Sequence, residues 1–207
     1  MTPSSSPAPW PEADRRLYLI TGARPDLPAF LEAAIRGGVD LVQVREKELT
    51  DRALLDVVRT AREVTSRLGV PLVVNDRADL AVVGGADAVH VGRDDLPVAE
   101  ARRFGLRVGL STHSAREVDA ADADYVGVGP VFATPTKPGR ASVGLELVRH
   151  AAACARIPWF AIGGINSTNV AAVVAAGATR IAAVRAIGDA PDPEAAARDL
   201  RAALIAA

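Results

Sequence analysis

Short apolar runs and amphipathic segments alternate along the chain from residue 16 to the C-terminus. Runs rich in valine, isoleucine and leucine are typical of buried strands, and apolar residues at helical spacing are typical of helices. The predicted strands cover 16–21, 39–45, 71–76, 87–92, 107–112, 124–130, 158–164 and 180–187. The predicted helices cover 27–38, 50–69, 77–85, 96–105, 114–122, 144–156, 167–177 and 192–207. Their strict alternation predicts a parallel sheet covered by helices.

Four similar segments favour closure of this sheet into a barrel. They are "GVDLVQVR" (38–45), "GADAVHVG" (85–92), "DADYVGVG" (122–129) and "GATRIAAV" (177–184), on every second predicted strand. Alternate strands supply matching layers in the interior of a (β/α)₈ barrel, whereas a doubly wound open sheet has no reason for this periodicity. We therefore expect an α/β protein with one domain, a (β/α)₈ TIM barrel over residues 14–207.

The first residues, "MTPSSSPAPWPEAD", are polar and rich in proline and serine. They lack the basic start and apolar run of a signal peptide, so we expect a flexible tail over residues 1–13. No apolar run approaches the roughly 18 residues needed to span a bilayer. The expected location is the cytoplasm.

Composition narrows the classes of partner. The formal net charge is −1, so no global positive field draws the chain to nucleic acid or to a membrane. Two tryptophans, two tyrosines and four phenylalanines are too few for a surface that stacks bases. The single cysteine, Cys154, excludes an internal disulfide and a thiol-based metal cage. Any binding of anions must therefore be local.

Polar side chains gather where the predicted strands end, which is where (β/α)₈ barrels place their active sites. Gln43, Arg45 and Lys47 alternate at the end of one strand, so their side chains point the same way. Further strand ends supply Asn75, Asp76, His90, Arg93, Asp94, Asp95, Ser111, Thr112 and His113. A purely structural role does not require this convergence on one rim.

Each of these residues also has a structural interpretation. Asn75 and Asp76 could form a turn and a helix cap, and one of Asp94 and Asp95 is expected to cap the helix that follows, with the other facing the pocket. His90 lies in an apolar strand, where an interior histidine with satisfied hydrogen bonds is the commoner case.

The basic residues have a similar alternative. Arg45 and Lys47 could pair with Glu46 or Glu48 at the surface, although their shared direction weakens that reading. Lys47 and Lys137 are the two lysines among 24 basic residues, and this scarcity is either a compositional bias or a need for a compact ammonium. Lys137 lies in the loop "GPVFATPTKPGR" (129–140), a candidate lid after the sixth strand.

As a group, these residues predict two anion sites. Asp76 and Asp95, on adjacent strand ends, suit Mg²⁺, which binds few protein carboxylates and keeps positions for phosphate oxygens. Arg45, Lys47 and Lys137 surround the same opening, which points to a diphosphate. "AIGGIN" (161–166) offers backbone N–H groups in the loop after the seventh strand, a usual place for phosphate in such barrels. Two anion sites suggest two phosphorylated substrates.

The chain resembles thiamine-phosphate synthases. The matching segments, in order from about residue 17 to 187, are "YLIT", "VQVREK", "NDRADLA", "AVHVGRDDLP", "GLSTHS", "GPVFATPTKPG" and "AIGGIN". The resemblance implies a (β/α)₈ barrel that uses Mg²⁺ and small-molecule substrates. It also implies the reaction, in which a hydroxymethylpyrimidine diphosphate loses diphosphate as the nitrogen of a thiazole phosphate attacks the pyrimidine methylene.

The resemblance also assigns roles. Lys137, Ser111 and Arg45 are the expected catalytic residues, and Asp76 and Asp95 the expected Mg²⁺ ligands. The expected substrate-binding residues are Gln43 on the pyrimidine side, Arg45, Lys47, Asn75 and Ser111 by the diphosphate, Thr134, Thr136 and Lys137 in the closing loop, and Gly164, Val184 and Arg185 at the thiazole phosphate. Two positions depart from the family pattern: Arg185 stands where many members have serine, and Arg93 where glutamine is common.

Two alternatives use a similar barrel. A thiazole tautomerase binds no diphosphate, and a non-catalytic sensor of thiamine precursors needs no closing loop. Neither has a use for both carboxylates, Asp76 and Asp95. The sequence leaves open whether the chain forms a homo-oligomer.

Overall fold

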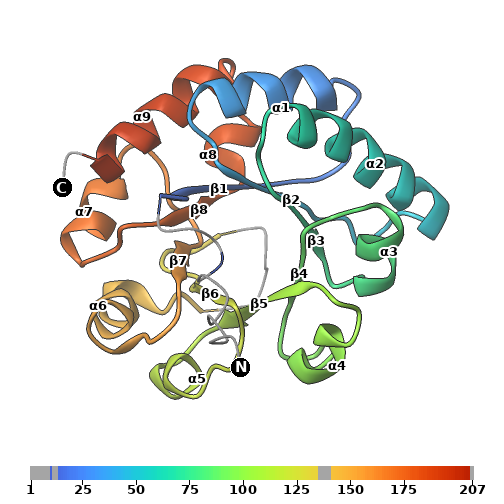
Figure 1. Ribbon diagram of the computed structural model, residues 1–207. Helices are drawn as coiled ribbons and strands as arrows, with labels where there is room; N and C mark the ends of the chain where they lie inside the picture. Colours follow the sequence, from blue (N-terminus) through green and yellow to red (C-terminus); the bar gives the residue numbers. More distant parts are fainter. Residues whose placement is uncertain (1–9, 11–13, 135–140, 206–207) are drawn as a thin grey trace, which may run out of the picture.

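The computed structural model describes residues 10, 14–134 and 141–205. In this part of the chain eight parallel strands close into a barrel in the order β1 to β8. The closing pair is β1 with β8, in which Leu17 lies opposite Ile181 and Leu19 opposite Ala183. The helices form a ring around the strands (Figure 1). The predicted (β/α)₈ barrel is confirmed.

The elements follow the predicted alternation. The strands are β1 (Leu17–Thr21), β2 (Leu41–Val44), β3 (Leu72–Asn75), β4 (Ala88–Val91), β5 (Arg107–Thr112), β6 (Tyr125–Val128), β7 (Trp159–Ile162) and β8 (Ile181–Ala183). The helices are α1 (Leu27–Arg36), α2 (Asp51–Arg67), α3 (Ala78–Val83), α4 (Val98–Arg102), α5 (Ala115–Asp119), α6 (Gly144–Cys154), α7 (Val170–Ala175), α8 (Arg185–Gly188) and α9 (Pro193–Ile205). Within the described ranges, no helix is both long enough and apolar enough to cross a membrane.

Most predicted strands extend one to three residues beyond the observed ones, and one runs into a helix. The sequence predicts a strand over 180–187, but β8 ends at Ala183 and residues 185–188 form the short helix α8. Ile187 is fully buried in the layer between strands and helices, so its apolar character serves helix packing. A short apolar run of this kind does not distinguish a strand from a helix by periodicity alone.

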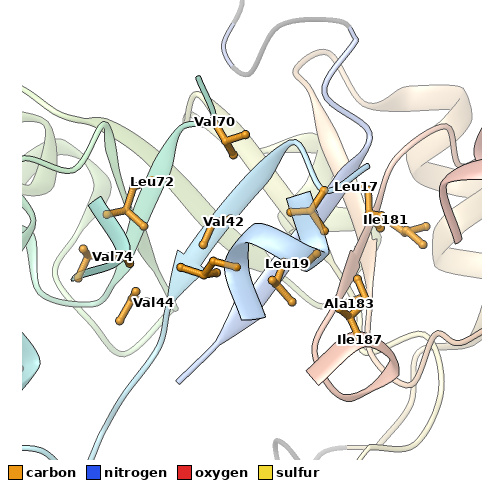
Figure 2. Close-up of a cluster of buried hydrophobic side chains, with 14 of the residues drawn as sticks. Leu17, Leu19, Val42, Val44, Val70, Leu72, Val74, Ile181, Ala183 and Ile187 are labelled. Atoms are coloured by element: carbon orange, nitrogen blue, oxygen red, sulfur yellow. The ribbon is translucent and has the colours of Figure 1, made fainter. Parts of the chain in front are cut away.

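The main core lies between the barrel wall and the helices. Figure 2 shows side chains of β1, β2, β3 and β8 that take part in it: Leu17, Leu19, Val42, Val44, Leu72, Val74, Ile181 and Ala183. All of these side chains are buried. Since successive strand residues point to opposite faces, their neighbours Tyr18, Gln43 and Val73 point into the barrel. The strands are buried on both faces, so the alternation of side chains along each strand decides which of them reach the interior.

The acidic lead-in of the internal repeat ties neighbouring strands together at their amino ends. Its carboxylates accept hydrogen bonds from backbone N–H groups: Asp40 from Leu17 at 2.9 Å, Asp87 from Leu72 at 2.8 Å, and Asp124 from Val108 at 2.9 Å. Each donor lies at or next to the start of β1, β3 or β5. The repeat thus stabilises the end of the barrel opposite the predicted site.

Trp10 also packs at this amino end. Its ring centroid lies 5.5 Å from that of Tyr125, the first residue of β6, with the planes tilted by 57°. The other residues of the expected tail, 1–9 and 11–13, lie outside the described residues.

Candidate active site

The carboxyl half of the barrel interior is lined by polar side chains from four neighbouring strands. Gln43, Asn75, His90 and Ser111 occupy inward positions on β2, β3, β4 and β5. Asn75 and His90 are direct register partners, and Gln43 and Asn75 are buried. His90 accordingly has interior partners, as the sequence predicts: its Nδ1 lies 3.1 Å from Tyr125 Oη and its Nε2 lies 3.0 Å from Ser111 Oγ.

Charged groups meet just beyond the ends of β2, β3 and β4. Lys47 Nζ lies 3.1 Å from Asp76 Oδ2, so Lys47 pairs across the rim and not with Glu46 or Glu48. Asp95 Oδ2 accepts a 2.7 Å hydrogen bond from the backbone N–H of Gly92, which turns the carboxylate back toward β4. We call this group, Arg45, Lys47, Asn75, Asp76 and Asp95, the charged rim.

The pKa of Asp76 shows how closely these groups lie. Burial raises the pKa of Asp76, the neighbouring Asp95 carboxyl raises it further, and Lys47 lowers it in part. Asp76 also has φ of 61°, a left-handed conformation that aspartate tolerates better than most residues. Two facing carboxylates of this kind match the oxygen ligands that Mg²⁺ prefers.

Asn75 adds a second observation in favour of a ligand. Among the residues that the structure describes, its Nδ2 atom is the buried side-chain nitrogen that lacks a hydrogen-bond partner. A buried donor without a partner costs about 1–3 kcal/mol, so a bound acceptor such as a phosphate oxygen would remove that cost. The residues present therefore fit both a divalent cation and a phosphate group.

The expected helix cap by Asp94 or Asp95 is wrong. Helix α4 begins two residues later than predicted, its N-cap residue is Pro97, and no side chain caps it. The Asp94 side chain is 85% exposed and lies 3.7 Å from Arg93, which is itself 64% exposed. Asp95 alone of this acidic pair turns to the site, because its hydrogen bond to Gly92 closes the loop.

A partly open cavity of about 430 Å³ lies on the other side of the opening. Five predicted site residues line it: Ser111, Thr134, Gly164, Val184 and Arg185. We call this group the cavity side. Gly164 has φ of 66°, and a Cβ atom there would lie 2.8 Å from the carbonyl oxygen of Ala133. Glycine is therefore required for the backbone to pass this close to the cavity.

Several predicted residues need separate mention. The Arg185 side chain bonds to Asp189 Oδ2 at 2.8 Å along α8, and both side chains are largely exposed. Thr136 and Lys137 lie outside the described residues. Arg45 is half-buried directly after β2.

The sequence interpretation missed two interior tyrosines. Tyr18 and Tyr125 are buried inside the barrel, and their hydroxyl oxygens lie 2.8 Å apart. Tyr18 also lines the cavity. Their alternation with outward-facing Leu19 and Val126 was a usable signal, since a polar tip at an inward strand position needs a partner. Tyr18 and Tyr125 lie near the starts of β1 and β6, away from the strand ends where the predicted site residues gather.

A closed barrel with charged and polar side chains gathered at its carboxyl edge is the architecture of a (β/α)₈-barrel enzyme. A family model described as "Thiamine monophosphate synthase" matches residues 17–187. A thiamine-phosphate synthase of Acidothermus cellulolyticus is 50% identical over 206 residues, covering 94% of this chain and 97% of that protein. One from Gloeobacter violaceus is 53% identical over 87% of this chain, which spans 55% of that longer relative.

A solved structure agrees with these matches. Thiamine phosphate pyrophosphorylase from Pyrococcus furiosus superposes with a TM-score of 0.84 at 32% identity, covering 93% of this chain and 96% of that one. The chain belongs to the thiamine-phosphate synthase family, and it is a transferase of that type.

Proposed function

We propose that the chain condenses 4-amino-2-methyl-5-hydroxymethylpyrimidine diphosphate with 4-methyl-5-(2-phosphoethyl)thiazole, giving thiamine phosphate and diphosphate. The observation that carries this assignment is the meeting of Asp76, Asp95 and Lys47 on the charged rim beside a partly open cavity. The charged rim suits the diphosphate of the first substrate. The cavity beside it suits the thiazole ring of the second.

In this reaction the bond between the pyrimidine methylene and the diphosphate oxygen breaks, and its electron pair leaves with the diphosphate. The lone pair of the thiazole nitrogen then forms the new C–N bond. No protein nucleophile is needed, so the work of the site is to stabilise negative charge as it develops on the leaving group. Fixed donors and cations in a partly enclosed site do this well.

The charged rim supplies those groups. Arg45 and Lys47 carry positive charge to the diphosphate, and Asn75 Nδ2 offers a buried donor that has no other partner among the described residues. Asp76 and Asp95 would hold Mg²⁺, which when bound neutralises charge on diphosphate oxygens. Lys137, in the loop with Thr134 and Thr136, is assigned to the same leaving group by resemblance to the family.

The cavity side takes the other substrate, except that its Ser111 lies by the leaving diphosphate. Gly164 and the backbone of Val184–Arg185 are assigned to the thiazole phosphate, and Gln43 to the pyrimidine. A volume of about 430 Å³ lies within the usual range for pockets that hold small molecules. Because Arg185 pairs with Asp189, we assign its backbone and not its side chain to the phosphate.

An assay with the purified full chain tests the proposal. Both substrates and Mg²⁺ should yield thiamine phosphate and diphosphate in equal amounts, and omission of either substrate or of Mg²⁺ should abolish the product. Isomerisation of a thiazole phosphate without the pyrimidine would favour a tautomerase. Binding of both substrates with no turnover would favour a sensor, and either result would refute the proposed condensation.

A further inference from the structure

Five polar side chains form a continuous hydrogen-bonded chain across the barrel interior, from β2 to β5. Gln43 Nε2 donates to Tyr18 Oη at 2.5 Å, and Tyr18 Oη lies 2.8 Å from Tyr125 Oη. Tyr125 Oη lies 3.1 Å from His90 Nδ1, and His90 Nε2 lies 3.0 Å from Ser111 Oγ. These hydrogen bonds thus connect the buried amide of Gln43 to the hydroxyl of Ser111 on the cavity side.

The amide at one end decides the direction of every bond. The Nε2 group of Gln43 can only donate, so the oxygen of Tyr18 accepts. Tyr18 is 2% exposed, and within the described residues Gln43 and Tyr125 are the hydrogen-bond partners of its hydroxyl. Its single proton must therefore go to Tyr125, because a buried O–H without an acceptor is costly.

The same reasoning identifies the donor in each of the remaining hydrogen bonds. Tyr125 accepts from Tyr18 and donates its own proton to Nδ1 of His90. With Nδ1 as acceptor, the neutral imidazole carries its proton on Nε2 and donates it to Ser111 Oγ. The oxygen of Ser111 is then an acceptor from His90, and the Ser111 proton is directed to the cavity that both residues line.

We propose that His90 is a positioning residue, set in its Nε2–H tautomer by Tyr125, that orients the Ser111 hydroxyl as a hydrogen-bond donor toward a substrate oxygen. This inference rests on the proposed function, in which that oxygen belongs to the leaving diphosphate. It assigns Ser111 a donor role and excludes a role as base or nucleophile, since the His90 nitrogen facing it is occupied by a proton.

Close packing of neighbouring rings keeps the five hydrogen-bonded side chains in place. A Cβ atom on Gly109 would lie 2.2 Å from the Tyr125 ring, so only glycine at 109 leaves room for this ring. Phe160 and Tyr18 pack edge-on against Tyr125, with ring centroids 5.8 Å and 5.9 Å away. Burial also raises the pKa of both tyrosines, which keeps their hydroxyls protonated and able to donate.

The opposite direction is the competing arrangement. If the Gln43 amide were turned over, its oxygen would accept from Tyr18, and every later bond would reverse. His90 would then carry its proton on Nδ1, and Ser111 would donate to Nε2, as an activated nucleophile does. The two arrangements differ in one observable, the protonated nitrogen of His90.

The wild-type enzyme labelled with ¹⁵N-histidine tests this difference directly. Two-bond ¹H–¹⁵N spectra at pH 8 should show a protonated Nε2 and an unprotonated Nδ1 for His90, assigned by loss of its signals in His90→Gln. A protonated Nδ1 would overturn the proposal. In Tyr125→Phe the tautomer should become mixed, while the signals of His150, which bonds Asp119 outside the barrel, stay unchanged.

Steady-state kinetics test whether the hydrogen bonds from Tyr125 and His90 affect the reaction through Ser111. Tyr125→Phe should lower kcat about tenfold and change KM for either substrate less than about threefold. In a Ser111→Ala background the same change should cost less than about twofold, because residues that act as a unit are not additive. An equal loss in both backgrounds would overturn the positioning role. Tyr18→Phe, one step further along, provides a second variant should Tyr125→Phe not fold.

These readouts separate the two proposals. If the wild-type enzyme forms no thiamine phosphate, the proposed function fails, yet the spectrum still reports which nitrogen of His90 carries the proton. If the enzyme turns over but Nδ1 is protonated, only the positioning role fails.

Discussion

The charged rim and the cavity side occupy opposite parts of one opening and offer substrates different kinds of interaction. The charged rim relies on ionised groups that solvent reaches, such as Lys47, whose side chain is 50% exposed. The cavity side relies on backbone geometry, a neutral hydroxyl and a partly open cavity. Changes to the first should therefore act mainly on the reaction rate and on metal binding. Changes to the backbone of the second should act mainly on substrate affinity and folding, whereas changes that disturb its Ser111 hydroxyl should act on the rate.

The largest expected effect is on the charged rim. Asp76→Asn keeps the shape and the left-handed backbone, which asparagine tolerates, but removes a charge from the proposed Mg²⁺ site. We expect kcat to fall about 10²–10³-fold in steady-state assays at saturating Mg²⁺. Asp79→Asn is the matched control, since Asp79 pairs with Arg77 at the surface and should leave the rate near wild type. Similar rates for both variants would remove Asp76 from the site.

The next effect is on the cavity side. Gly164→Ala places a Cβ atom 2.8 Å from Ala133 O and Phe132 Cβ at a positive φ, so the backbone must shift. We expect KM for the thiazole phosphate to rise at least about tenfold and stability to fall by about 1–3 kcal/mol. Gly85→Ala shares the positive φ of 72° but meets no atom within 4 Å, so it should lose stability without a change in KM.

A smaller effect is expected from the lysine of the loop. Lys137→Arg keeps the charge but replaces a mobile ammonium by a planar fork, so we expect kcat to fall about five- to tenfold. Arg149→Lys, the reverse exchange in an exposed pair with Glu146, should have no effect on kcat. Normal turnover by Lys137→Arg would mean that the scarcity of lysine is a compositional accident.

The smallest effect is on stability without metal. Because the pKa of Asp76 is raised in the folded protein, the folded state holds its proton more firmly than the unfolded chain, and the free energy of unfolding falls as pH rises through that pKa. Asp95→Asn removes the charged neighbour that contributes to this shift, so in EDTA at pH 8 it should raise Tm by about 2 °C.

Two controls sharpen this measurement. The gain should shrink toward about pH 4, where protonation already relieves the repulsion. Added Mg²⁺ should stabilise the wild-type protein more than Asp95→Asn, and Asp94→Asn should behave as wild type because its side chain is solvated. A Tm for Asp95→Asn below that of wild type in EDTA would contradict a repulsive pair.

The contrast between the two regions also explains which features sequence alone could predict. Lys47, Asp76 and Asp95 follow directly after apolar strands, and in a parallel barrel all strand ends meet at one edge. Local order along the chain was therefore enough to assemble the charged rim. It was not enough to choose between Asp94 and Asp95, because that choice depends on the hydrogen bond to Gly92.

Other features depended on partners far away in sequence. The bond between Tyr18 and Tyr125 joins residues 107 positions apart, and no local pattern specifies that their rings meet. The predicted end of β8 was wrong for the same reason. Ile187 continues the apolar run, but it lies in α8 and packs in the core between the strands and the helices.

By itself, the sequence determined the alternation of strands and helices, the barrel, and the polar residues at the carboxyl edge of the barrel, because periodicity and strand direction are local properties. The tertiary structure decided which carboxylate turns inward, where the cavity lies, and how a hydrogen-bonded chain from Gln43 reaches Ser111. These depend on side chains from different strands meeting inside a closed barrel, and only closure brings them within hydrogen-bonding distance.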